Sequence, residues 1–357
     1  MKTPELLRIR LHNQLLAGNN FATPREIVSW MGAMQSQNYE MAKWGVGVRL
    51  PGNTNEMVEA AINRGEIIRT HILRPTWHFV DANDIHWMLE LTSPRIKQAF
   101  HGYARTLNYD IKEILQGCER LPKILEKHGH LTRQEIGEHL IAEGIPINDP
   151  HKVAYIASLA ELDGIICSGE VRGNKQTYAL LHHRADKNVQ FSTEEALAEL
   201  AKRFFKSHGP ATLADYAWWS GLSMTEAKKG LEAVKHLFIS EEMNGNIYWM
   251  RSDLQSPPSE ERSALLLPAF DEYVVSYKER AEIISEKYYR KVLTINGIFS
   301  PTIHLNGEII GSWKRAKQKK TITAELSFFE TTPKKVQPWF KQAIKEYEKF
   351  YSTQYKH

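Results

Sequence analysis

The sequence predicts an α+β fold that is mainly helical, with three winged-helix domains in tandem and a β-rich C-terminal element that contains a β-hairpin. Two observations predict this fold. The same order of elements, a helix, a short helix, a third helix and a β-hairpin, recurs along the chain although the repeats share few residues. The clearest hairpins turn at Asn-Gly, the dipeptide that two-residue hairpin turns favour.

The repeat is clearest in the second domain, residues 118–190. The stretch ERLPKILEKHGHLTRQEIGEHLIAEGI predicts two helices, and Thr132 with Glu135 predicts a capping box between them. Four apolar residues lie on one face of the predicted third helix: Val153, Ile156, Leu159 and Leu162. IICSGEVRGNKQTYALL then predicts the hairpin.

The third domain, residues 191–252, follows the same order. Ser192 and Glu195 predict another capping box at the start of STEEALAELAKRFFKSHG. TLADYAWWSG predicts a short helix that ends at Gly221, and SMTEAKKGLEAVKHL predicts the third helix. FISEEMNGNIYWM predicts a hairpin with Asn-Gly at its tip.

The first domain, residues 1–90, shows the order less clearly. Thr23-Pro24 predicts a capped helix start, and we expect that helix to end near Met34. TNEMVEAAINRG predicts another helix, and IIRTHILRPTWHFV predicts two strands. GVGVRLPG lacks the spacing of a dinucleotide-binding loop and is interpreted as a strand or loop. Residues 91–117 are expected to form a helical connector.

The C-terminal segment, residues 253–357, begins with the best linker candidate by composition, QSPPSEERS at 255–263. SALLLPAFDEYVVSYKER predicts a buried strand and a turn, and GIFSPTIHLNGEIIGSWKR predicts a hairpin around Asn306-Gly307. Five basic residues follow: Lys314, Arg315, Lys317, Lys319 and Lys320. KKVQPWFKQAIKEYEKFY predicts an amphipathic final helix.

The composition limits the classes of protein to which this sequence can belong. Subtracting 42 Asp and Glu from 46 Lys and Arg gives a net charge of +4, which permits a nucleic-acid partner without requiring one. Cys118 and Cys167 lie far apart and lack metal-ligand spacing, so we expect reduced thiols in the cytoplasm. The charged N-terminus and the lack of a long apolar run predict neither a signal peptide nor a membrane span.

Tandem winged helices most often bind nucleic acid, although some serve as protein scaffolds. The sequence contains neither His-Glu-x-x-His nor Cys-x-x-Cys, so no metal or other cofactor is predicted. His71 and His78 lack a third ligand at suitable spacing. Asp271-Glu272 is an acidic pair at the end of an apolar strand, where it either caps a turn or has a role at the site; the sequence leaves both open.

Four motifs occur in a fixed order: QSQ after an amphipathic helix, LRPTWHFV, LLPAFDEYVVSYKER and NGIFSPTIHLNGEIIGSWKR. Together they resemble the HTH_42 superfamily of winged-helix DNA-binding proteins and, within it, the AlkZ-like DNA glycosylases, over about residues 5 to 350. The resemblance implies a C-shaped arrangement of the three domains with a basic surface for double-stranded DNA. It also implies excision of bulky alkylated purines and, in some members, unhooking of interstrand crosslinks.

The family's signature is Gln-x-Gln with an aliphatic middle residue. Gln35 and Gln37 match it and become the catalytic candidates, whereas Ser36 departs from it. The related YcaQ crosslink-repair branch carries Gln-x-Asp, so this chain groups with the Gln-x-Gln branch. The family's lesion-probing hairpin maps to residues 301–313, with its tip at Asn306-Gly307. Candidates for contact with substrate or DNA are Ser36, Asn38, Arg74, Thr76, His78, Asp271, Asn306, Gly307, Trp313, Lys314 and Arg315.

Two glutamines suit only a particular leaving group. A neutral amide is a poor base, so neither side chain can deprotonate water as a carboxylate would. A purine alkylated at N3 or N7 already carries positive charge and leaves as a neutral base without a general acid. Two amide oxygens can hold a water near the anomeric carbon and direct their dipoles at an oxocarbenium-like transition state. The pair therefore suits a cationic lesion and not a normal base.

Spacing constrains the backbone. Side chains at i and i+2 point apart on a helix and to one side of an extended chain. For both glutamines to meet one sugar, residues 35 to 37 must be extended or in a turn, with turn-prone Asn38 following. The competing interpretation is that both amides only satisfy the end of the helix.

We therefore expect a monomeric, monofunctional DNA glycosylase that acts on damaged duplex DNA in the cytoplasm, associated with the nucleoid. The alternative is a non-enzymatic winged-helix DNA-binding protein or regulator, and a protein-interaction scaffold is a third possibility.

Overall fold

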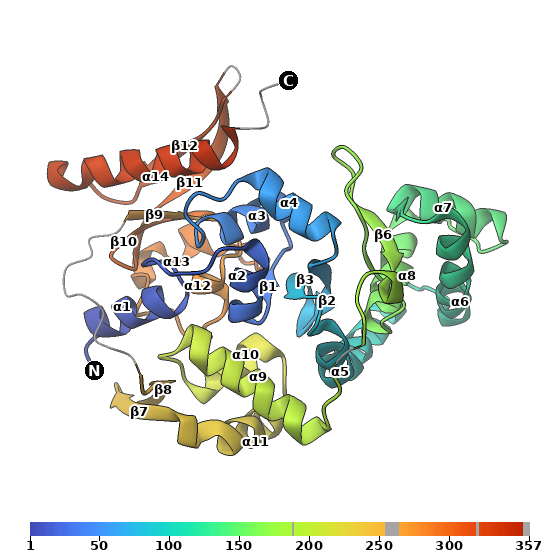
Figure 1. Ribbon diagram of the computed structural model, residues 1–357, viewed down its shortest axis with the longest axis horizontal. Coiled ribbons are helices and arrows are strands. Elements are labelled where there is room, and N and C mark those ends of the chain that lie inside the picture. Colours follow the sequence, from blue (N-terminus) through green and yellow to red (C-terminus); the bar gives the residue numbers. More distant parts are fainter. Residues whose placement is uncertain (188, 254–263, 319–320, 353–357) are drawn as a thin grey trace. The chain divides into compact units, whose positions relative to one another are not determined.

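The computed structural model describes residues 1–187, 189–253, 264–318 and 321–352. It is a mixed fold of helices and small antiparallel sheets, as the sequence predicts (Figure 1). The chain packs into two compact units. The first combines three segments of sequence, Met1–Glu59, Leu197–Trp219 and Ser223–His357, and the second combines Ala60–Ala196 with Ser220–Leu222. The expected linker at 255–263 lies outside the described residues.

The elements of the N-terminal half are α1 (Thr3–Asn13), α2 (Pro24–Met31), β1 (Met34–Gln35), α3 (Tyr39–Gly47), α4 (Asn55–Asn63), β2 (Ile67–Ile72), β3 (Arg74–Asp81), α5 (Ile85–Thr106), α6 (Ile111–His128), β4 (Leu131–Thr132), α7 (Arg133–Ala142), α8 (Pro150–Leu162), β5 (Ile166–Ser168), β6 (Thr177–Leu180) and η1 (Leu181–His183).

The elements of the C-terminal half are α9 (Thr193–His208), α10 (Leu213–Ser220), α11 (Met224–Val234), η2 (Lys235–Leu237), β7 (Phe238–Met243), β8 (Asn246–Arg251), β9 (Ala264–Leu267), α12 (Glu272–Val275), α13 (Glu286–Val292), β10 (Thr302–Leu305), β11 (Glu308–Gln318), β12 (Thr321–Phe328), η3 (Lys334–Val336) and α14 (Gln337–Phe350).

A four-stranded antiparallel sheet with the order β12-β11-β10-β9 organises the C-terminal part of the first unit. Helix α14 lies along this sheet (Figure 1). The indole N–H groups of Trp44 and Trp313 donate to the carbonyls of Leu266 and Leu267 on β9, at 2.7 and 2.8 Å. The ring of Tyr347 on α14 meets both indoles edge-on, so α3, β11 and α14 share one aromatic core.

The interpretation of GVGVRLPG as a strand or loop is wrong for its first three residues, because α3 continues to Gly47, and it holds for residues 48–52, which form turns and a bend. A Cβ atom at Gly47 would lie only 2.4 Å from the ring of Phe350 on α14. The glycine therefore permits close packing of two helices that are 300 residues apart in sequence, and it does not mark a loop.

Local signals for helix starts and hairpins are confirmed. Capping boxes form at Thr23 and Thr132, and Ser192 exchanges hydrogen bonds with Glu195 as predicted. Asn244 and Gly245 both adopt positive φ between β7 and β8, which is the backbone that a type I′ turn needs.

The second unit contains two small sheets, a β2–β3 ribbon and a three-stranded sheet with the order β4-β6-β5. Helices α6, α7 and α8 pack together, and their apolar faces form one core with strand β6 (Figure 1). Helix α5 runs through the expected domain boundary at 90/91, and α6 runs through the one at 117/118. The three-domain division stays a prediction. Across the described ranges, every helix is too short or too polar to cross a membrane.

A Gln-x-Gln segment anchored on a buried carboxylate

The two glutamines lie on the short connection between α2 and α3. Helix α2 ends at Met31, three residues before the expected end, because Gly32 adopts a φ of 76° that a helix cannot contain. Met34 and Gln35 are then extended. Asn38 stops the extended run, since its Oδ1 accepts the N–H of Met41 at 3.2 Å and so caps α3.

The three positions of the Gln-x-Gln segment alternate in exposure. Ser36 is buried, with none of its surface exposed, while Gln35 is half-buried and Gln37 is exposed. Neighbouring side chains on extended backbone point to opposite sides. Strand β1 covers Met34 and Gln35, and a bend follows at Gln37, which agrees with the predicted extended or turn backbone. Ser36 is buried between the two glutamines, and its contact with DNA stays a prediction.

The backbone of Gln35 is held by Glu272, the first residue of α12. The N–H of Gln35 donates to Oε1 of Glu272 at 2.6 Å, and the carboxylate itself is 1% exposed. The indole N–H of Trp219 donates to the other oxygen, Oε2, at 3.1 Å. The sequence marks Asp271 and Glu272 as an acidic pair, and only the fold shows that Glu272 is the one that holds Gln35.

Asp271 has the capping role that the sequence leaves open, and its expected contact with substrate stays a prediction. It is 3% exposed, and Oδ1 accepts the N–H of Tyr273 as the cap of α12. Both carboxylate oxygens also accept from the guanidinium of Arg49 at 2.8 Å. Both oxygens of this buried carboxylate therefore accept hydrogen bonds from groups of the protein.

The Asn306-Gly307 hairpin forms as predicted, with φ values of 53° and 89°, but its tip does not project. Asn306 is exposed, whereas Gly307 is buried, and a Cβ there would lie 2.7 Å from the hydroxyl of Tyr273 and 3.0 Å from Leu7 of α1. The turn therefore packs against the core of the first unit, and the assignment of Gly307 to a DNA-probing tip stays a prediction.

Strand β11 buries alternate side chains as far as Trp313, and mostly exposed residues follow. Trp313 is 1% exposed and bonds to β9, and its contact with DNA stays a prediction. Lys314 and Lys317 are exposed. Arg315 lies 3.5 Å from a carboxylate oxygen of Glu40 and over the ring of Tyr351. Of the five predicted basic residues, Lys319 and Lys320 fall outside the described ranges.

The amino-acid sequence of the chain was compared with the profiles of known protein families. The profile of the DNA glycosylase AlkZ-like family matches residues 28–350 of the chain.

The chain belongs to the AlkZ-like DNA glycosylase family.

The fold agrees with this membership. The structure is similar to that of the Streptomyces sahachiroi DNA glycosylase AlkZ, with a TM-score of 0.79, 98% of this chain and 96% of that chain covered, and 18% sequence identity. A comparison with curated proteins finds no match. Family and fold together support a DNA repair glycosylase, and an AlkZ-like glycosylase acts on DNA.

Three further candidates lie on strand β3 of this AlkZ-like chain, in the second unit. Arg74 and Thr76 are half-buried, and His78 is buried with its Nδ1 donating to the carbonyl of Thr76 at 3.0 Å. His78 has no exposed surface in this structure, and its role in binding DNA stays a prediction. His71, on the facing strand, pairs with the buried carboxylate of Glu161, which explains a histidine there without a metal.

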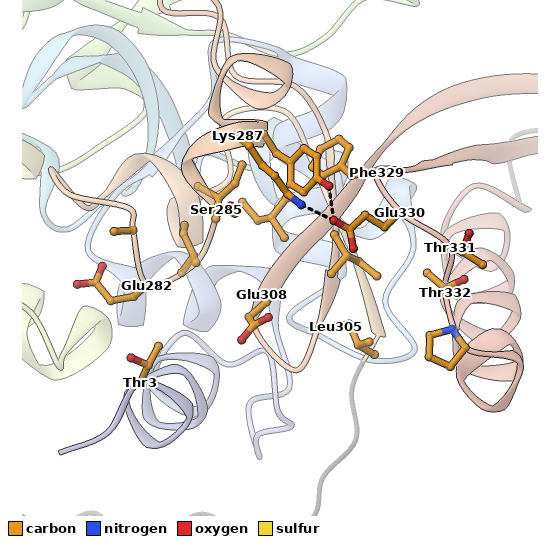
Figure 2. Close-up of a pocket in the computed structure, with 17 residues that line it drawn as sticks. Thr3, Glu282, Ser285, Lys287, Leu305, Glu308, Phe329, Glu330, Thr331 and Thr332 are labelled. Atoms are coloured by element: carbon orange, nitrogen blue, oxygen red, sulfur yellow. Dashed lines mark hydrogen bonds and ion pairs between the residues drawn. The ribbon is translucent and has the colours of Figure 1, made fainter.

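A cavity of about 520 Å³ opens beside α13 and the β10–β11 turn (Figure 2). Carboxylates predominate among its charged groups: Glu282, Glu308 and Glu330, against Lys287. Figure 2 shows Lys287 directed at Glu330, with which it forms an ion pair. An acidic lining repels phosphate, and neither glutamine is among the lining residues, so the lining does not favour contact with the DNA backbone.

Proposed function

We propose that the protein is a monofunctional glycosylase that hydrolyses the N-glycosidic bond of alkylated, cationic purines in duplex DNA. Gln35 and Gln37 would position the attacking water and face their carbonyl dipoles toward the sugar. The observation that carries the proposal is the exposure of the segment, in which Ser36 is buried while Gln35 is half-buried and Gln37 is exposed. Family membership supplies the glycosidic bond as the target.

The chemistry follows from the charge of the lesion. An alkylated purine cation needs no proton to leave, so the enzyme has only to stabilise positive charge as it moves onto the sugar. Amide oxygens are acceptors at every pH of interest, and two of them can hold one water by accepting its hydrogens. Bulky and crosslinked purines carry the same ring charge and belong to the same proposed substrate class.

The proposed DNA contact of the C-terminal segment moves from the β10–β11 turn to the β11–β12 hairpin. Lys314 and Lys317 are exposed on β11, and such side chains suit the phosphate backbone. Arg315 already neighbours Glu40 and Tyr351, so it would orient the strand more than it would bind phosphate.

The deciding experiment measures bases released from alkylated duplex DNA by mass spectrometry under single-turnover conditions. Gln35→Ala and Gln37→Ala should each slow release of N7-alkylguanine or N3-alkyladenine by about 100-fold or more. Affinity for DNA and thermal stability should stay close to those of the wild type, because Gln37 is exposed and the anchoring bond of Gln35 uses its backbone N–H.

Full excision by both variants would contradict the assignment of the site. A sequence-selective footprint on undamaged DNA, with no base released from any alkylated substrate, would instead favour a DNA-binding regulator. Borohydride should trap no covalent complex, because the proposed mechanism contains no Schiff-base lysine.

A further inference from the structure

We propose that Glu272 is a positioning residue for excision, which holds the backbone of Gln35 where the glutamine side chain meets the sugar. The inference rests on the proposed function of the Gln-x-Gln segment. Glu272 is 237 positions away from Gln35 in sequence, and its carboxylate lies behind the segment, in the interior of the first unit.

The contact itself is short. The N–H of Gln35 lies 2.6 Å from Oε1 of Glu272, slightly shorter than is usual for a hydrogen bond from an N–H to a carboxylate. Such bonds are stronger than those between neutral groups, and burial strengthens them further. Because the bond is made by the backbone at position 35, it fixes the origin of the side chain without occupying the amide.

The carboxylate is fixed in turn by groups on other elements of the same unit. Oε2 accepts from the indole N–H of Trp219 at 3.1 Å and from the hydroxyl of Ser276, one turn further along. The Nε2 atom of His208 lies 3.7 Å from the same oxygen, too far for a direct hydrogen bond. Burial lowers the pKa of His208, so its imidazole is neutral at neutral pH.

Trp219 supports the segment at a second point. Its ring lies 3.6 Å from the position that a Cβ at Gly32 would occupy, while its N–H holds Glu272. One buried indole therefore packs beneath the turn that starts the segment and also orients the carboxylate that anchors Gln35. A segment held at both places keeps its geometry before DNA arrives, which is the preorganisation that water positioning needs.

The test compares Glu272→Gln and Glu272→Ala with the wild type in single-turnover release of N7-alkylguanine. Glutamine keeps an oxygen for the N–H of Gln35 but loses the charge, so we expect excision about 10-fold slower, and about 100-fold slower for alanine. Affinity for alkylated DNA should be unchanged, because Glu272 is buried. Trp219→Phe, which removes the N–H that orients the carboxylate, should fall between them.

A double-mutant cycle separates positioning from general damage. In the Gln35→Ala background, Glu272→Gln should slow excision no further, because the side chain it positions is gone. Glu161→Gln is the matched control, since Glu161 is equally buried, pairs with His71 and belongs to the second unit. It should lower thermal stability while leaving excision per folded molecule unchanged.

The outcomes are distinct. If Gln35→Ala abolishes excision while Glu272→Gln and Glu272→Ala excise at the wild-type rate, the positioning role is overturned and the proposed function stands. Additive effects in the cycle would also overturn it, because Glu272 would then act independently of Gln35. If Gln35→Ala itself excises normally, the proposed site fails first.

Discussion

The role of a single residue in this protein depends more on its burial and its partners than on its residue type. The serine of the Gln-x-Gln segment is buried where related sequences have an aliphatic residue, which agrees with an inward position. Asp271 and Glu272 are adjacent acids, yet the first is paired with Arg49 and the second holds Gln35. Adjacent side chains at the start of a helix point in different directions, so the two carboxylates bind different partners.

His304 provides a test of burial at one residue. Its Nδ1 donates toward the carbonyl of Gly307, its Nε2 faces the hydroxyl of Thr302, and burial lowers its pKa to about 4. Above about pH 6.5 the imidazole is neutral in both the folded and the unfolded state. As the pH falls from there, the unfolded chain binds a proton that the folded protein refuses, so stability decreases down to about pH 4.

The lowered pKa of His304 should reduce the free energy of unfolding by about 3 kcal/mol as the pH falls from about 6.5 to about 4. Urea unfolding of the wild type and of His304→Phe at several pH values between these limits measures it. The difference in stability between the two proteins should change with pH in favour of the variant as the solution becomes more acidic. A difference that is constant with pH would contradict the buried neutral imidazole.

At the scale of elements, strand β11 joins two hairpins with opposite environments. Its turn to β10 packs against α1 and Tyr273, while its pairing with β12 continues to Gln318 and presents exposed lysines. The Asn-Gly signal therefore predicts where the chain turns and carries no information on which turn reaches a ligand.

The proposed DNA-binding role of β11 predicts a change in salt dependence. Lys314→Ala and Lys317→Ala should each weaken binding to duplex DNA and reduce the slope of log affinity against log salt by about 1. Fluorescence anisotropy over a range of salt concentrations measures both quantities. Lys287→Ala is the control, because Lys287 pairs with Glu330 in an acidic cavity and should leave the slope unchanged. Equal slopes for all three variants would remove β11 from the DNA interface.

The close packing of α3 on α14 predicts opposite effects for two glycine substitutions. Gly47→Ala places a methyl group 2.4 Å from Phe350, so it should destabilise the protein by about 1–3 kcal/mol. Gly102→Ala, in α5, meets nothing within 4 Å and should stabilise by up to about 1 kcal/mol, the difference in helix propensity. Urea unfolding measures both, and destabilisation of equal size would show that packing against Phe350 is not the cause.

At the scale of the whole molecule, the first unit is assembled from segments far apart in sequence. Arg49 of the N-terminal segment binds Asp271 of the C-terminal segment and both the carbonyl and the side chain of Gln14. Tyr277 links this group to the carbonyl of His208 in the middle segment. The anchor of the Gln-x-Gln segment therefore exists only after these segments have come together.

The buried Arg49–Asp271 pair predicts a large loss of stability when one partner is removed. Asp271→Ala leaves the guanidinium of Arg49 without its carboxylate, with an expected cost of about 3–5 kcal/mol of unfolding free energy. Chemical denaturation measures it. The double replacement Arg49→Met with Asp271→Leu should recover part of that loss, and a double variant less stable than the single one would contradict the account.

The sequence alone determines the features that depend on neighbouring residues. Thr23 before Pro24, Thr132 with Glu135, and Ser192 with Glu195 start helices as predicted, because these capping signals need only residues up to three positions apart. Residue order also reveals the family and the two glutamines, and their spacing predicts the extended backbone.

Only the tertiary structure decided which candidate residues are accessible and what holds the site. Asp271, Trp313, Gly307 and His78 are polar, aromatic or turn residues that appear available in the sequence and are buried in the fold. Glu272 shows the converse, since nothing near it in sequence connects it to Gln35. Burial and long-range hydrogen bonds depend on which segments meet in space, and the free energy that brings them together belongs to the whole core and not to any local pattern.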